Sequence, residues 1–155
     1  MTAVLQRAAR AAVTVAGETV GAVGEGLLVL LGVAEGDDER DAELLAAKIA
    51  ACRIFCDEEG RMNRSVLDVG GGVLIVSNFT LLANYRHGNR PDYFGAAAPE
   101  TAEKLYDYFC AEMRERGLPV ATGRFGADMQ IDLLADGPVT IVMESAVLRK
   151  KGEKT

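Results

Sequence analysis

The sequence predicts a mixed α/β fold, in which two helices pack on curved, mainly antiparallel β-sheet with a barrel-like core. Three observations lead to this prediction. Short runs rich in valine, leucine and alanine recur along the chain and are typical of strands. Two longer segments instead have apolar residues at helical spacing, and glycines separate the runs. With 155 residues, 49% of them hydrophobic, the chain suits one compact domain.

The first half of the sequence predicts three strands and a helix. Residues 3–15 read as one strand, or two with a bend, and 20–23 as a short strand after a turn. The continuous apolar run 27–33 is typical of a central strand that is covered on both faces. Asp37 or Asp38 then caps a helix that is expected to extend to about Phe55. Its apolar positions are Leu44, Leu45, Ala47, Ile49, Cys52 and Phe55.

The second half begins with a buried strand, Val73–Val76, after three glycines. A helix starts at Pro99 and ends at Gly117. Its predicted buried face consists of Ala102, Leu105, Tyr106, Phe109, Cys110 and Met113. Residues 120–125, 129–134 and 139–143 predict three further strands. We expect 1–147 to form the domain and 148–155 to be a disordered basic tail.

The composition of the chain argues against several classes of function. The net charge of −6 argues against a sequence-independent nucleic-acid binder. No apolar run is long enough to cross a bilayer and the first residues lack a signal-peptide pattern, so we expect a cytoplasmic protein with no membrane partner. Cys52, Cys56 and Cys110 with a single histidine do not make a zinc site. We therefore expect structural thiols, no metal and no cofactor.

Two short segments stand out chemically. After the strand that ends near Val76, the polar residues Ser77, Asn78 and Thr80 surround Phe79. Buried hydroxyl and amide groups need partners, so they either close a strand edge or meet a ligand. The second segment is Gly137-Pro138, between two apolar strands. It predicts a turn, but a Gly-Pro bond can be cis and its backbone can approach a ligand closely.

The loop 83–95 is polar and long, and it contains the only histidine, His87. It also carries Arg86, Arg90 and several aromatic side chains. Arginines that contact phosphates and aromatic rings that stack on bases are typical of RNA-binding surfaces. An ordinary surface loop is the alternative.

Taken together, Ser77-Asn78-Phe79-Thr80-Leu81 and Gly137-Pro138-Val139-Thr140 resemble the D-aminoacyl-tRNA deacylase family. The resemblance covers nearly the whole chain except the basic tail, and it implies the fold of that family. Further similar segments are Leu5-Gln6-Arg7, 26–33, Arg53-Ile54-Phe55, Met62-Asn63, 88–91, 105–109 and 122–129.

The resemblance implies an enzyme that hydrolyses the ester between a D-amino acid, or glycine, and the terminal adenosine of tRNA. It implies a homodimer without a DNA partner, in which segment 77–81 forms the floor of each site. Gly137-Pro138 of the other subunit, in the cis form, excludes L side chains, and Arg7 fixes that segment. Phe125, Gly126 and Met129 are assigned to the adenosine pocket, and Arg86 and Arg90 to tRNA contacts.

For the chemistry, backbone N–H groups near Phe79 and Thr80 can stabilise an oxyanion. A Thr80 nucleophile needs an adjacent base that the sequence does not offer. We therefore favour attack by water, helped by the 2′-hydroxyl of the RNA. The chain departs from the family at Asn78, commonly glutamine, and at Ala135, commonly asparagine.

Three alternatives remain open at this point. One is an RNA-binding homodimer of the same fold that has lost catalysis. The second is a hydrolase that uses His87 with Ser77 or Thr80. The third is a related deacylase with a trans Gly-Pro bond and relaxed handedness, suited to L-alanine mischarged on a threonine tRNA.

Overall fold

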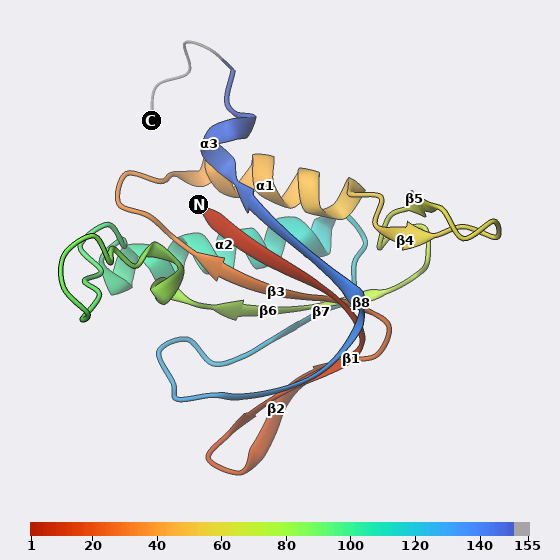
Figure 1. Cartoon of the computed structure of the whole chain (residues 1–155), viewed down its shortest axis with the longest axis horizontal. Helices are drawn as coiled ribbons and strands as arrows, with labels where there is room; N and C mark the ends of the chain where they lie inside the picture. Colours follow the sequence, from red (N-terminus) through yellow and green to blue (C-terminus); the bar gives the residue numbers. More distant parts are fainter. Residues whose placement is uncertain (151–155) are drawn as a thin grey trace.

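The structure is a computed structural model that describes residues 1–150 (Figure 1). One curved sheet contains most of its strands, namely β1 (Thr2–Val15), β2 (Glu18–Val23), β3 (Gly26–Gly32), β6 (Gly72–Ser77), β7 (Val120–Thr122) and β8 (Gln130–Glu144). A separate hairpin is formed by β4 (Phe55–Cys56) and β5 (Met62–Arg64). The helices are α1 (Glu39–Ala51), the 3-10 helix η1 (Phe79–Leu82), α2 (Pro99–Glu115) and the short α3 (Ser145–Leu148).

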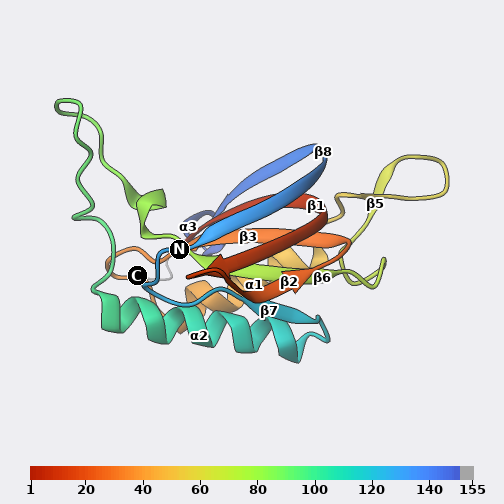
Figure 2. The same cartoon turned by 90° about the horizontal axis from the view of Figure 1, so that it is seen from below.

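The long strand β1 organises the sheet, because it pairs antiparallel with β8 along one edge and with β3 and then β2 along the other. On the far side of β3, strands β6 and β7 follow in parallel orientation. The sheet curls until β2 contacts β7, and this gives the barrel-like shape in Figure 1. Helices α1 and α2 cover the outer face (Figure 2). The expected mixed α/β fold is confirmed.

The sheet has a hydrophobic core on each face, and the central strands contribute to both. Leu27, Val29 and Leu31 of β3 face the helices, whereas Leu28 faces the inside of the curl. Strand β6 divides in the same way, with Val73 and Ile75 on the helix side. The prediction that 27–33 is a strand covered on both faces is therefore confirmed, as is the buried strand 73–76.

Helix α1 begins as expected but ends early. Asp38 and Asp41 form a reciprocal capping box at its start. At Cys52 the backbone becomes extended, and Phe55 pairs with Arg64 in the hairpin instead of continuing the helix. The buried apolar residues of α1 are Ala42, Leu45, Ala46, Ile49 and Ala50, so Leu44 and Ala47 were wrongly assigned to its buried face. By contrast, all six residues predicted for the buried face of α2 are buried.

The predicted strands after residue 117 also need correction. Strand β7 ends at Thr122, and the turn expected at Gly137-Pro138 is absent, because 130–144 form the single strand β8. Gln6 pairs with Thr140 and Ala8 pairs with Ala135, so Arg7 of β1 faces the four residues 136–139. Gly137 and Pro138 thus lie in a bulge of a continuous strand.

The cysteines do not share one environment. Cys110 is buried, and burial raises the pKa of its thiol to about 11. Cys56 is exposed in β4, so the expectation of a structural thiol is wrong there, and Cys52 is half-buried. Within residues 1–150, no helix is long and apolar enough to cross a membrane.

The folded domain extends beyond its expected boundary at residue 147. Leu148 ends α3, and the Arg149 guanidinium forms ion pairs with Asp38 and with the carboxylate of Asp41, which is 1% exposed. The Ser145 hydroxyl donates a hydrogen bond to Asp41 over 2.7 Å. These contacts place 148 and 149 in the domain, while 151–155 of the expected tail lie outside the described residues.

Burial alone would raise the pKa of Asp41. The carboxylate accepts hydrogen bonds from the Arg149 guanidinium, the Asp38 backbone N–H and the Ser145 hydroxyl, and together these hold its pKa well below the ordinary value. Asp41 therefore stabilises the fold above the pKa of an unfolded aspartate, about 3.9, and this contribution is lost as the pH falls below that value.

We expect Arg149→Ala to lower the free energy of unfolding by about 3 kcal/mol at pH 7, because it leaves the buried Asp41 carboxylate without its cation. The matched control is Arg61→Ala, which removes an exposed ion pair with Glu59 and should cost less than about 1 kcal/mol. Urea denaturation measures both. The effect of Arg149→Ala should shrink below about pH 4, and an equal effect at pH 3 and pH 7 would contradict this assignment.

Candidate active site

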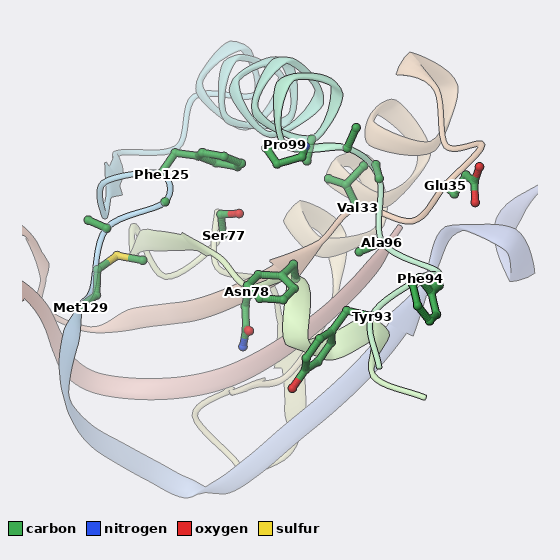
Figure 3. Close-up of a pocket in the computed structure, with 16 residues that line it drawn as sticks. Val33, Glu35, Ser77, Asn78, Tyr93, Phe94, Ala96, Pro99, Phe125 and Met129 are labelled. Carbon is green, nitrogen blue, oxygen red and sulfur yellow. The ribbon is translucent and has the colours of Figure 1, made fainter. Parts of the chain in front are cut away.

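A cavity of about 750 Å³ opens where the parallel strands β3, β6 and β7 end (Figure 3). Val33 follows β3, Ser77 ends β6, and Phe125 follows β7. Parallel strands place their carboxyl ends at the same edge, which is where open α/β sheets bind ligands. Other lining residues are Glu35, Asn78, Phe79, Tyr93, Phe94, Ala96, Ala97, Ala98, Pro99, Ala102, Gly126, Ala127 and Met129.

The floor of the cavity is formed by segment 77–82, which packs directly against the end of β3. The Asn78 N–H donates to the Leu31 carbonyl over 2.8 Å, and the chain then turns into η1. Gly32 makes this contact possible, since a Cβ there would lie 2.5 Å from Cδ2 of Leu82 and 3.1 Å from the Asn78 carbonyl oxygen. Segment 77–82 is therefore positioned by the absence of a side chain at residue 32.

The polar groups of this segment are arranged unequally. Ser77, Asn78 and Phe79 line the cavity, whereas Thr80 is exposed and outside the lining. The Thr80 hydroxyl donates a hydrogen bond to the side-chain oxygen of Asn78. Phe79 and Thr80 occupy the first turn of η1, where backbone N–H groups have no partner inside the helix. The Phe79 ring meets Tyr93 edge to face, with centroids 5.0 Å apart.

Phe125, Gly126 and Met129, which the family resemblance assigns to one pocket, all line the cavity, and Figure 3 shows Phe125 and Met129 at one end of it. The Phe125 ring packs at 6.0 Å, centroid to centroid, against Tyr106 of α2. The Tyr106 hydroxyl donates to the Ile75 carbonyl over 2.7 Å, and burial raises the pKa of this phenol, so it remains a neutral donor. Phe125 is thus held by a residue that is itself fixed to β6.

Gly137 and Pro138 do not line the cavity of their own chain, and both are exposed. Their peptide bond is cis. The Arg7 side chain donates through Nε to the Asp136 carbonyl over 3.0 Å and through a terminal nitrogen to the Ile54 carbonyl over 2.7 Å. It also pairs with the Asp136 carboxylate at 3.2 Å. Arg7 therefore braces the bulge from the opposite strand.

The loop 83–95 projects from the body of the molecule (Figure 2). Its base is closed by two backbone hydrogen bonds between Asn84 and Asp92. Arg86, His87 and Arg90 are exposed in this loop and do not line the cavity. The structure therefore does not bring His87 to Ser77, and no group of three or more His, Cys, Asp or Glu side chains in 1–150 is placed to hold a metal.

Several lining residues were missed by reasoning from sequence. Tyr93 and Phe94 belong to the loop singled out above, but nothing in the sequence shows that they turn back to the cavity. The run Ala96–Ala98 before Pro99 was an available signal, because small residues before a helix let a ligand approach its first turn. No feature of the sequence around Glu35 indicates that it lines a cavity.

The comparisons with solved structures define a class of fold. A structure titled "c-Myc DNA Unwinding Element Binding Protein" matches with a TM-score of 0.87 and 42% identity, covering 93% of this chain and 98% of that one. A second, titled "Structural Analysis of a probable eukaryotic D-amino acid tRNA deacylase", matches with a TM-score of 0.78 over 93% of this chain and 100% of that one. Its 19% identity shows the fold alone.

Sequence comparison then gives the family. The family model described as D-Tyr-tRNA(Tyr) deacylase matches residues 4–144. A D-aminoacyl-tRNA deacylase of Roseiflexus sp. is 56% identical over 97% of both chains. That of Chloroflexus aurantiacus is 59% identical over 96% of this chain and 93% of the other. The chain therefore belongs to the D-Tyr-tRNA(Tyr) deacylase family, and the resemblance and the enzyme class expected from the sequence are confirmed.

We expect Gly32→Ala to displace segment 78–82, because the new Cβ meets both Leu82 and the Asn78 backbone. Overpacking of this kind costs about 1–3 kcal/mol. Amide chemical shifts measured by NMR should change at 78–82. Gly24→Ala, where no atom lies within 4 Å of the new Cβ, is the control. Unchanged shifts at 78–82 in Gly32→Ala would contradict the proposed contact.

Proposed function

We propose that this protein hydrolyses the ester bond of D-aminoacyl-tRNA, releasing the D-amino acid and free tRNA, as chiral proofreading in the cytoplasm. The proposal includes glycine esterified to tRNA(Ala) as a substrate. The observation that carries it is the cavity that residues 77–79 line together with Phe125 and Met129. The relatives at 56% and 59% identity bear the name of this activity.

In this proposal, the terminal adenosine binds between Phe125 and Met129, and its ester reaches the floor at Ser77 and Phe79. These side chains and Gly126 supply shape and apolar surface, which suits a nucleoside. Arg86 and Arg90, in the projecting loop, contact phosphates further along the tRNA. Because the proposed selection acts through the main chain, no contact with the amino-acid side chain is needed, and many D-amino acids are accepted.

Ester hydrolysis passes through a tetrahedral oxyanion, and the N–H groups of Phe79 and Thr80 are its proposed donors. Asn78 fixes the Thr80 hydroxyl, which supports a positioning role for both side chains. His87 does not line the cavity, and the one carboxylate that does, Glu35, lies past the floor at its other end, so neither is placed to activate Ser77 or Thr80. We therefore propose attack by water, with the substrate's own 2′-hydroxyl assisting.

We further propose that two copies of the chain form the active enzyme. Strand β8 is 15 residues long and, among the described strands, pairs only with β1. It exposes Leu134 by 51% and Val142 by 63%. A long edge strand with apolar side chains favours association with another chain. The cavity is also open beside Phe79, which is 55% exposed, and a second subunit would cover it.

In the dimer, Gly137 and Pro138 of one subunit reach into the other subunit's cavity. Arg7 and Asp136 support this by bracing the exposed bulge, so the backbone at Gly137 is held firmly enough to exclude an L side chain. Backbone exclusion requires no contact with the D side chain. Asn78 precedes the proposed donors in the chain and Ala135 lies in β8 two residues before Gly137, so neither supplies a proposed donor N–H, and the effect of these two expected departures from the family is on rate.

The neighbouring structure whose title names a DNA element does not lead us to propose DNA binding here. This chain has a net charge of −6, whereas binding to duplex DNA depends mainly on neutralising phosphates. A catalytically inactive RNA-binding dimer is the main competing function, and activity separates the two.

The test is incubation of the purified protein with D-tyrosyl-tRNA and L-tyrosyl-tRNA. Rapid loss of the D ester alone is expected, and persistence of the D ester would overturn the proposal in favour of the RNA-binding dimer. Ser77→Ala and Thr80→Ala should each retain measurable hydrolysis. Complete loss of turnover with intact tRNA binding in either variant would instead indicate a side-chain nucleophile.

We expect Gly137→Ala to lower kcat/KM for D-tyrosyl-tRNA by about 100-fold. The φ angle of Gly137 is +143°, and a Cβ there would lie 2.4 Å from the Val139 nitrogen, so the bulge must move. Gly24→Ala should leave the rate unchanged, because its Cβ meets no atom within 4 Å. A Gly137→Ala enzyme with full activity would show that this backbone is not part of the site.

A further inference from the structure

The cavity continues past the floor to a second end, formed by Glu35 and Phe94 (Figure 3). These residues come from different parts of the chain, which backbone hydrogen bonds hold together. The Glu35 N–H donates to the Gly95 carbonyl over 2.9 Å, and the Ala97 N–H to the Val33 carbonyl over 2.9 Å. An isolated bridge between Ala34 and Ala96 lies between them. The end is therefore a fixed part of the site.

The two side chains are chemically unlike the rest of the lining. Phe94 is 87% exposed, so nearly its whole ring is accessible to a ligand. Glu35 is the one carboxylate in a lining made otherwise of apolar, small or uncharged polar residues. Within the described residues, no hydrogen bond or ion pair involves its carboxylate. An exposed aromatic ring and an available acceptor at the same end of a cavity are a combination that suits a nucleobase with an amino group.

We propose that Glu35 and Phe94 bind the cytosine of the nucleotide that precedes the terminal adenosine. This inference rests on the proposed function, since every tRNA ends in the sequence CCA. With the adenosine at Phe125 and Met129 and its ester at the floor, we place the nucleotide on its 5′ side at the remaining end of the cavity. Bases at single-stranded RNA ends can splay and stack individually on aromatic side chains.

The chemistry selects cytosine over uracil at this position. The N4 amino group of cytosine donates a hydrogen bond, which the Glu35 carboxylate accepts while the base stacks on Phe94. Uracil presents the acceptor O4 at the same place, so two acceptors would face each other. The carboxylate also repels phosphate, which directs the backbone toward Arg86 and Arg90 in the adjacent loop.

The experiment uses three synthetic esters, namely D-tyrosyl-adenosine, D-tyrosyl-CpA and D-tyrosyl-UpA. The native enzyme should hydrolyse the CpA ester with a kcat/KM about tenfold higher than either of the others. In Glu35→Gln, the amide can donate to O4, so the preference for CpA over UpA should disappear. Phe94→Ala should lower kcat/KM for the CpA ester about tenfold, to the level of the adenosine ester.

Neither substitution should change hydrolysis of D-tyrosyl-adenosine, which lacks the second base. Glu103→Gln, on the exposed face of α2, and Leu67→Ala, at an exposed apolar position, are matched controls that should keep the CpA preference. Equal hydrolysis of all three esters by the native enzyme, or equal loss on all three in the variants, overturns the cytosine site alone. Failure to hydrolyse any of the three short esters overturns this inference, and failure to hydrolyse D-tyrosyl-tRNA as well overturns the proposed function.

Discussion

The burial of β3 and β6 on both faces is the constraint on which the rest of the structure depends. Because the helices cover one face and the curl of the sheet covers the other, neither strand can shift by one residue without moving every side chain into the wrong core. Their carboxyl ends are consequently fixed relative to each other. Ser77 in the cavity floor and Val33 in the cavity wall are therefore held in fixed positions, because they lie at the ends of these strands.

A second consequence concerns how the site obtains its chemistry. The cavity lining contains one carboxylate and no cationic side chain, so most of its polar groups belong to the backbone or to small side chains. Such groups are positioned by the fold and need no reorganisation when a substrate arrives. Gly32 is an example, since the absence of a side chain there allows η1 to pack closely against the end of β3.

The sequence predicted those elements whose signal is local and strong. The apolar runs at 27–33 and 73–76 and the periodic face of α2 have patterns that few other structures fit, and Phe125 and Met129 were placed through the family resemblance. Prediction from the sequence failed where pairing between strands that are distant in the chain overrides the conformation that the local residues favour. Gly-Pro indicates a turn, but pairing with β1 on both sides keeps β8 continuous. Glu35 and Phe94 could not be paired, because only the folded backbone brings 33–35 next to 95–97.

The bulge opposite Arg7 also determines where the chain can change length. Strand β8 pairs in continuous register with β1 at residues 130–134 and again at 140–144, so one inserted or deleted residue between these segments would have to be absorbed in the irregular stretch that contains Gly137 and Pro138. The tip of the β4–β5 hairpin, between Cys56 and Met62, carries no such double anchor. Relatives should therefore vary in length at that tip and keep the spacing from Gln130 to Glu144 constant.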